Sequence, residues 1–210
     1  MSKLLYIQAS PRLERSHSTA VADAFVEAYR ESHPDDEVET VNLFSRDLPA
    51  FDGMAVQAKY TILHGKEHSE EESDAWEAVE AVIEEFKAAD RYVFAVPMWN
   101  FGVPYRLKQY IDILVQPSYT FSYSPDTGYT GLVKDKQAVV VYARGGEYPE
   151  GSDFEAYDMQ KPYVESILGF IGVTDVQSIV VEPTLMGGPE TAQQKRADAI
   201  EKAREMAASW

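Results

Sequence analysis

The sequence predicts one α/β domain over residues 1–210, with a five-stranded parallel sheet covered by helices on both faces. Two observations lead to this prediction. Short segments that are apolar on both faces alternate along the chain with longer segments of helical periodicity, which is typical of buried parallel strands separated by covering helices. In addition, no repeat, low-complexity segment or long linker divides the 210 residues, a length that suits one sizeable core.

The first expected strand is the apolar segment from Leu4 to Ile7, which ends before Ser10-Pro11. Two shorter segments, from Tyr119 to Tyr123 and from Tyr129 to Leu132, flank a turn sequence and predict a hairpin outside the main sheet. The other four expected strands contain, in order, Val38 to Leu43, Tyr92 to Val96, Ala138 to Tyr142 and Val176 to Val181.

Helices are expected between these strands because apolar residues recur there at three- and four-residue intervals. The first helix carries Val21, Ala24, Phe25 and Ala28 on one face, with Ser18 as its expected N-cap. A loop is expected around Pro49 and Asp52-Gly53, and Pro104 is expected in the first turn of a helix. The remaining helical faces contain Trp76, Val79, Ile83 and Phe86, then Leu107, Tyr110, Ile111 and Leu114, then Val164, Ile167, Leu168 and Ile171, and a charged helix begins near Glu190.

The chain is strongly acidic, with 19 Lys and Arg against 35 Asp and Glu and a formal net charge of −16. Such a surface disfavours nucleic acid and anionic membranes as partners. The absence of cysteine excludes disulfides, cysteine-ligated metals and thiol nucleophiles, so redox chemistry requires a bound cofactor. With no apolar segment of spanning length and no signal sequence, we expect a soluble cytoplasmic protein. Nine carboxylates between Glu67 and Glu85 indicate either a solvated helix face or adaptation to high salt.

In an open parallel sheet, ligands bind beyond the carboxyl ends of the strands, and three unusual segments stand there. The first runs from Ser10 to Ser18, between a strand and a helix. Its serine hydroxyls, the arginines Arg12 and Arg15 and the positive end of the following helix predict a phosphate-binding loop. It contains neither a Walker motif nor a G-x-G-x-x-G fingerprint. An ordinary polar connection with a helix cap is the alternative.

The second segment is Pro97-Met98-Trp99-Asn100-Phe101-Gly102-Val103-Pro104, and the third is Ala143-Arg144-Gly145-Gly146-Glu147-Tyr148. Aromatic rings and a thioether suit a flat conjugated ring, and an asparagine can bond its polar edge. Paired glycines allow the backbone to approach a ligand closely. Core packing and a plain turn are the respective alternatives, but the placement of all three segments at strand ends favours a binding site.

These motifs together resemble the FMN-dependent NADH:quinone and azo-compound oxidoreductases, which are homodimers with a flavodoxin-like fold. Met98-Trp99-Asn100-Phe101 resembles the family's M-[YW]-N-F segment, and Arg144-Gly145-Gly146 resembles its S-R-G-G turn, with Ala143 in place of the usual serine. The stretch from Leu168 to Asp175 resembles its L-G-F-I-G-[IV]-T-D motif. The resemblance covers nearly the whole chain.

The resemblance implies bound FMN, with NADH as electron donor and with quinones and azo compounds as acceptors in ping-pong turnover. The phosphate would lie on Ser10, Ser16, His17 and Ser18, and the isoalloxazine ring against Met98, Trp99, Asn100 and Phe101 and against Ala143, Arg144, Gly145 and Gly146. Phe121 and Phe170 would line the substrate site, contributed by one subunit or by two. No catalytic side chain and no metal is implied, because the flavin carries the chemistry.

Two other functions compete with this interpretation. His64-Gly65-Lys66-Glu67-His68 fits the H-x-x-E-H zinc pattern, although Gly65 weakens a helix there. A flavodoxin-type electron carrier would also have this fold and an acidic docking surface. Such carriers usually have a T-x-T-G-x-T loop, which this sequence lacks.

Overall fold

The computed structural model describes residues 1–63 and 69–210. Its main sheet has five parallel strands in the order β2-β1-β3-β6-β7, which confirms the predicted architecture. The strands are β1 (Lys3–Gln8), β2 (Glu37–Asn42), β3 (Arg91–Pro97), β6 (Gln137–Ala143) and β7 (Asp175–Val181). A separate antiparallel hairpin, β4 (Phe121–Ser124) and β5 (Gly128–Gly131), lies where the sequence predicts one.

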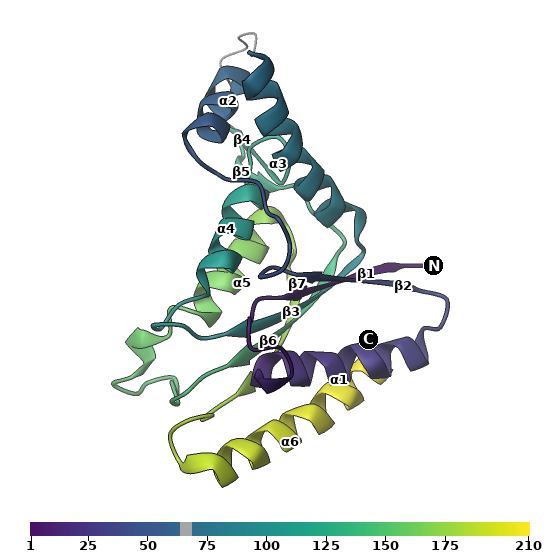
Figure 1. The fold of residues 1–210 in the computed structure, drawn as a ribbon, viewed down its shortest axis with the longest axis vertical. Coiled ribbons are helices and arrows are strands. Elements are labelled where there is room, and N and C mark those ends of the chain that lie inside the picture. The colour runs from purple at the N-terminus through teal and green to yellow at the C-terminus, as the bar shows by residue number, and fades with distance from the viewer. Residues whose placement is uncertain (64–68) are drawn as a thin grey trace.

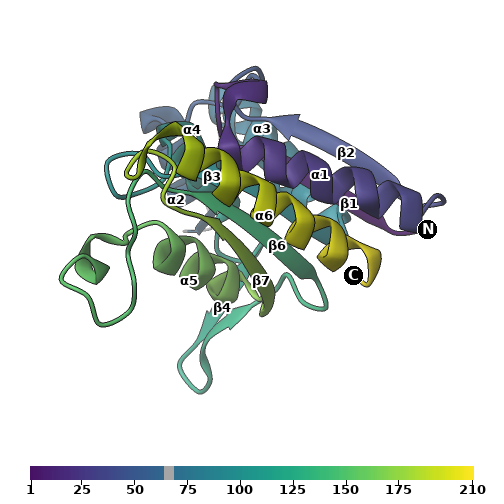
Figure 2. The same cartoon turned by 90° about the horizontal axis from the view of Figure 1, so that it is seen from below.

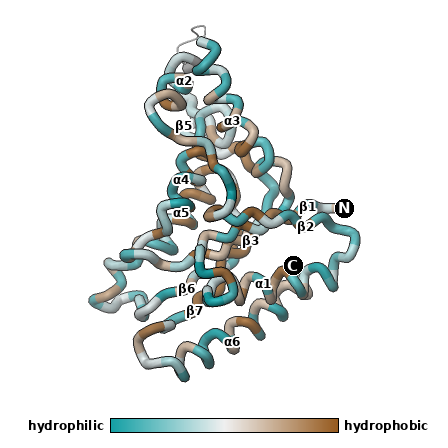
Figure 3. The backbone as a smooth tube through the Cα atoms, viewed as in Figure 1, coloured by the Kyte–Doolittle hydropathy of each residue, from teal (hydrophilic) through white to brown (hydrophobic). Residues whose placement is uncertain are grey.

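Helices cover both faces of the sheet (Figure 1). On one face α1 (His17–Ser32) and α6 (Gly188–Ala208) lie side by side, as Figure 2 shows from below. On the other face lie α3 (Glu70–Ala88), α4 (Tyr105–Leu114) and α5 (Lys161–Ile171). Hydrophobic and hydrophilic segments alternate along α1 and α6, because only one side of each helix meets the sheet (Figure 3).

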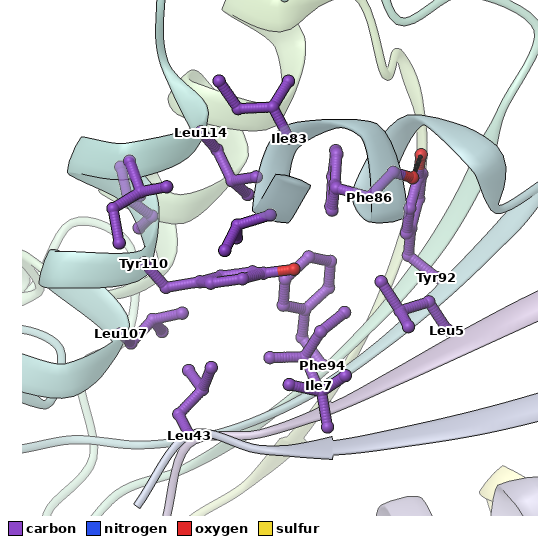
Figure 4. Close-up of a cluster of buried hydrophobic side chains, with 14 of the residues drawn as sticks. Leu5, Ile7, Leu43, Ile83, Phe86, Tyr92, Phe94, Leu107, Tyr110 and Leu114 are labelled. Carbon is purple, nitrogen blue, oxygen red and sulfur yellow. Dashed lines mark hydrogen bonds between the residues drawn. The ribbon is translucent and has the colours of Figure 1, made fainter. Parts of the chain in front are cut away.

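Alternate strand residues supply the two halves of the core. Leu5 and Ile7 contribute to the half under α3 and α4, whereas Leu4 and Tyr6 contribute to the half under α1 and α6. Figure 4 shows the first half, in which the buried ring of Tyr110 lies among aliphatic and aromatic side chains from the sheet and from α3 and α4. Burial on both faces is the reason that these strands are continuously apolar in the sequence.

Three local expectations were wrong. The segment around Asp52-Gly53 begins a helix, α2 (Gly53–Leu63), because the Asp52 carboxylate accepts hydrogen bonds from the amides of Met54 and Ala55 as an N-cap. Helix α1 is capped by Ser16 rather than Ser18, since Ser16 is extended and its hydroxyl accepts from the Thr19 amide. Pro104 is the N-cap residue of α4, one position before its first turn.

Specific residues also fix the start of α3 and the end of α5. Ser69 and Glu72 form a capping box at the start of the acidic helix α3. Gly172 ends α5 with a left-handed φ of 111°. Gly131 of the hairpin packs against the Gly172 backbone so closely that a side chain at position 131 would not fit.

Among the described residues, no helix is long and apolar enough to cross a bilayer. The His64–His68 zinc pattern lies outside the described residues.

Candidate flavin site at the strand ends

Three neighbouring strands bring the three expected site segments to one edge of the sheet. Strand β2 lies on one side of β1, whereas β3, β6 and β7 follow one another on its other side. The junction between β1 and β3 is therefore the switch point of the sheet, where ligands of such folds bind. The Ala9 amide donates to the Ala95 carbonyl at 3.0 Å, and the Met98 amide donates to the Ala143 carbonyl at 2.8 Å. The ends of β1, β3 and β6 therefore form one continuous backbone surface at the switch point.

The loop between β1 and α1 presents buried serine hydroxyls at the start of the helix. Ser10, Ser16 and Ser18 are all buried. The Ser16 and Ser18 hydroxyls lie 3.1 Å apart, and the Ser10 hydroxyl accepts from the Arg12 amide at 3.3 Å. The positive end of the 16-residue helix points its first amides into the same loop. Hydroxyls and free amides at a helix start form a site suited to a phosphate group.

His17, the first residue of α1, has a buried Nδ1 atom with no hydrogen-bond partner in the described part of the chain. Burial lowers the pKa of this imidazole, and the positive charges of Arg196 and Arg12 lower it further. A buried polar atom without a partner destabilises the protein. An anion bound in this loop would accept from that imidazole and remove the deficit, so the residues present fit the phosphate of a cofactor.

The segment after β3 forms a strained two-residue turn. Asn100 and Phe101 both have positive φ, 48° and 69°, and Trp99 and Gly102 close the turn with two reciprocal backbone hydrogen bonds of 3.0 Å. Positive φ at two successive residues without glycine is unusual and points to function. The amides of the two central residues take no part in the closing bonds of such a turn, which leaves them for a ligand. Phe101 is 44% exposed, so its ring is accessible as well.

Arg144 stands behind the glycine turn and does not project from it. Its guanidinium is 3% exposed and contacts Asp158 at 2.7 Å, Gln160 at 3.1 Å and Glu182 at 3.3 Å. Gln160 in turn donates to the Val96 carbonyl at 2.9 Å. This buried network joins the end of β3 to the loops that follow β6 and β7. The side chain of Arg144 thus supports the shape of the site, while the carbonyls of Arg144 and Gly145 accept hydrogen bonds from the amides of Thr184, Leu185 and Met186.

An open recess of about 720 Å³ lies beside the turn formed by Trp99, Asn100, Phe101 and Gly102. Trp99 lines it together with Phe51 and Tyr105, and Phe44 packs against the rings of Trp99 and Tyr105 with centroid distances of 5.7 Å. Lys108 of α4 lines the same recess. The lining therefore combines aromatic rings with five polar or charged side chains, Asp52, Asn100, Lys108, Gln109 and Asp112. Such a mixture suits a flat conjugated molecule with polar edges.

Phe121 and Phe170, the expected substrate residues, contact one another with ring centroids 4.8 Å apart. Tyr129 joins them at 6.0 and 5.5 Å. However, Phe170 lies near the last turn of α5, whereas Gln160 at the other end of that helix reaches the strand ends. Ten residues of helix separate the two by about 15 Å along its axis. Within one chain, the aromatic pair is not brought to the strand-end site.

Comparison with known proteins decides the family. A family model described as the flavodoxin-like fold matches residues 2–207. An FMN-dependent NADH:quinone oxidoreductase of Nitratidesulfovibrio vulgaris (strain DP4) is 56% identical over 207 residues, which covers 99% of each chain. The chain belongs to the FMN-dependent NADH:quinone oxidoreductase family. This confirms the resemblance drawn from the motifs.

Solved structures agree with this family assignment. An azoreductase from Bacillus anthracis str. Sterne is 32% identical, with a TM-score of 0.91 over the full length of both chains. An FMN-dependent NADH-azoreductase from Bacillus anthracis str. Ames Ancestor, in complex with FMN, is 29% identical, with a TM-score of 0.87 over 99% of this chain and 100% of that one.

Several residues that shape the candidate site of this chain were not predicted from the sequence. Asp158, Gln160 and Glu182 hold Arg144, and Phe44 and Phe51 extend the aromatic wall beside Trp99. The first group has no local signal, because its members become neighbours only through the fold. The Pro49 to Gly53 segment was assigned to a loop, and nothing in its composition marked Phe51 as part of a binding surface.

Proposed function

We propose that this protein is an FMN-dependent NADH:quinone oxidoreductase that also cleaves aromatic azo compounds reductively. The observation that carries the proposal is the convergence of a phosphate-type loop, a strained aromatic turn and a glycine turn at one switch point of the sheet. The names of the relatives support it: a quinone oxidoreductase 56% identical and azoreductases with the same fold.

In this proposal, the phosphate loop holds the FMN phosphate through the hydroxyls of Ser10, Ser16 and Ser18, the imidazole of His17 and the first amides of α1. The ring system rests against two segments, Met98, Trp99, Asn100 and Phe101 on one side and Ala143, Arg144, Gly145 and Gly146 on the other. When bound, FMN supplies the two-electron transfer from NADH to the acceptor. No side chain is assigned as a general base, and the protein contributes binding, orientation and exclusion of water.

The donor and the acceptor are proposed to use the same open face in turn, which gives ping-pong kinetics. The open recess beside Trp99 is lined by three aromatic rings together with five polar or charged side chains. Such a surface stacks with many flat acceptors and selects weakly among them. Broad specificity for quinones and azo compounds is therefore expected. Because NADH is an intracellular metabolite, we also propose a cytoplasmic location.

We propose further that the working unit is a homodimer in which Phe121 and Phe170 of one subunit face the flavin segments of the other. The support is geometric: the aromatic pair lies at the far end of α5 from the strand ends of its own chain. Partly exposed rings on the hairpin would then gain a partner surface, and each active site would need two chains.

A hybrid experiment tests this arrangement. Ser16→Asp keeps an N-cap side chain but places a carboxylate where the phosphate would bind, and the double variant Phe121→Ser/Phe170→Ser removes the aromatic half. Each variant alone should be nearly inactive. If the halves come from different chains, mixing after reversible dissociation restores activity at about a quarter of the sites. A site formed within one chain gives no recovery, and that outcome would refute the shared site.

The family of the chain and the azoreductase structures support an enzyme over the flavodoxin-type electron carrier. A carrier reacts poorly with nicotinamide donors and requires a protein partner. Rapid anaerobic reduction of the FMN-loaded protein by NADH alone supports the enzyme, and slow reduction that accelerates only with a reductase protein supports the carrier.

A further inference from the structure

The connection between β2 and α2 runs alongside α4 and is bonded to it (Figure 1). Arg106, the second residue of α4, donates from Nε to the Leu43 carbonyl at 2.7 Å and from Nη2 to the Arg46 carbonyl. Gln109, on the next turn of α4, donates from Nε2 to the Pro49 carbonyl at 3.0 Å. Side chains of α4 therefore bond three backbone carbonyls of a connection that contains no helix or strand of its own.

The two donors form one unit, which we call the α4 clamp. The Nη1 atom of Arg106 donates to the Oε1 atom of Gln109 at 2.8 Å, so the Gln109 amide accepts at one end and donates at the other. No carboxylate of the described residues forms an ion pair with Arg106, and its charge strengthens bonds to neutral oxygens instead. The guanidinium is a rigid plane, and every one of its nitrogens is engaged.

The α4 clamp fixes a part of the chain that carries two rings of the aromatic wall. Phe44 stands between the two residues whose carbonyls Arg106 bonds, and its ring packs against Trp99 with centroids 5.7 Å apart. Phe51 follows, two residues after the carbonyl that Gln109 bonds, and lines the recess together with Trp99. The positions of both phenylalanine rings relative to Trp99 therefore depend on the clamp.

Arg106 does not itself line the recess, so its effect on a bound molecule passes through the rings that the clamp holds. A wall that is already in place binds a flat molecule without further ordering. A wall that moves must be ordered when the molecule binds, and each side chain ordered in this way weakens binding by about twofold to tenfold. Loss of the clamp therefore lowers affinity without removing any group that touches the bound molecule.

We propose that Arg106, together with Gln109, is a positioning residue that sets the shape of the acceptor site. The proposal rests on the proposed function, since it takes the recess beside Trp99 as the place where acceptors bind. A one-ring acceptor stacks well only when the walls of the recess stand at the right separation. A larger ring system reaches more of the surface and depends less on one wall. The clamp thus favours one-ring quinones over larger acceptors.

The experiment reduces the FMN-loaded protein anaerobically with a stoichiometric amount of dithionite, so that it does not depend on NADH. Reoxidation by a benzoquinone or by an anthraquinone sulfonate is then followed by stopped-flow absorption over a range of acceptor concentrations. The variants are Arg106→Met, which removes all the donors, and Arg106→Lys, which keeps the charge. Arg91→Met is the matched control: Arg91 is also half-buried and donates to the Tyr29 hydroxyl at 3.1 Å, but it begins β3 and lies at the far end of that strand from the site.

We expect Arg106→Met to raise the half-saturating benzoquinone concentration by about threefold to tenfold, while the limiting rate changes by less than about twofold. The half-saturating concentration of the anthraquinone sulfonate should rise less. Arg106→Lys should resemble Arg106→Met, because one nitrogen cannot occupy the positions of the whole guanidinium group. In the FMN-free protein, hydrogen–deuterium exchange of residues 43–52 should be faster in both variants than in Arg91→Met.

Three results overturn the positioning role. One is an unchanged half-saturating benzoquinone concentration in Arg106→Met. Another is an equal rise for both acceptors that Arg91→Met reproduces, because general loss of stability then explains it. The third is wild-type behaviour of Arg106→Lys, which assigns the effect to charge alone. If the wild-type protein binds no FMN, or its reduced form reacts with neither acceptor, the proposed function fails instead. Equal exchange of residues 43–52 in Arg106→Met and Arg91→Met overturns the clamp independently of that result.

Discussion

Arg144 gives the sharpest stability prediction, because its buried charge is held by three partners from two loops. Replacing it by methionine (Arg144→Met) keeps an unbranched side chain but removes the positive charge. The Asp158 carboxylate, 11% exposed, then loses its 2.7 Å ion pair. Gln160 and Glu182 lose their contacts at the same time.

The size of the effect follows from burial. Removal of one partner from a buried ion pair costs about 3–5 kcal/mol of unfolding free energy. Asp158 retains hydrogen bonds from the amides of Gln160 and Lys161 at its other oxygen, and Glu182 is 25% exposed, so both are partly compensated. We therefore expect the lower end, about 3 kcal/mol. For a domain of this size that corresponds to a fall of about 6–12 °C in Tm.

The assay is urea unfolding of the FMN-free protein, followed by tryptophan fluorescence and far-UV circular dichroism. Lys108→Met is the matched control, because its ion pair with Asp112 is exposed and contributes about 0.5 kcal/mol or less. A loss below 1 kcal/mol in Arg144→Met, or an equal loss in both variants, would refute the reasoning that the buried network supports the site.

Three further predictions follow from other contacts. The pKa of Asp36 is lowered by hydrogen bonds from the Ser2 amide and the Tyr29 hydroxyl, so its stabilising effect is present above its ordinary pKa of 3.8 and is lost as the pH falls through its lower folded value. Asp36→Asn should therefore narrow the stability difference between pH 5 and pH 2 in urea titrations, and an unchanged difference would contradict this. Ser16→Asp should bind FMN at least about tenfold more weakly, because its carboxylate would stand where the phosphate is proposed to bind. Its Tm should change little, because aspartate also caps helices. Unaltered FMN affinity in a fluorescence titration would show that the phosphate does not bind in this loop. If the acidic surface reflects adaptation to salt, Tm should rise between 0.1 and about 2 M NaCl as repulsion is screened, and a flat Tm would count against that adaptation.

The sheet and its ligand-binding edge were predictable because each depends on short-range patterns. Segments such as Leu4 to Ile7 are apolar on both faces, and that pattern requires a strand covered by helices on each side. Once the strands are assigned, Ser10, Met98 and Ala143 are expected near one another, because the carboxyl ends of parallel strands lie at the same edge of a sheet. The structure confirms this neighbourhood through the backbone bond from Met98 to Ala143.

The remaining features depend on contacts between distant residues. Arg144 was expected at the ligand, but Glu182, thirty-eight residues later, helps to hold its side chain in the interior. The start of α1 at His17 was misplaced by two residues, because Ser16 and Ser18 have the same capping preference and only the backbone conformation distinguishes them. Helix α2 was missed because its apolar residues show no clear one-sided pattern.

The most direct test of the central claim is an anaerobic absorption spectrum of the purified protein with FMN, before and after NADH is added. The account predicts flavin bands that bleach rapidly with NADH alone and return when a benzoquinone is added. Protein that binds no FMN, or bound FMN that NADH does not reduce, would contradict the assignment of the three strand-end segments to an FMN-dependent oxidoreductase.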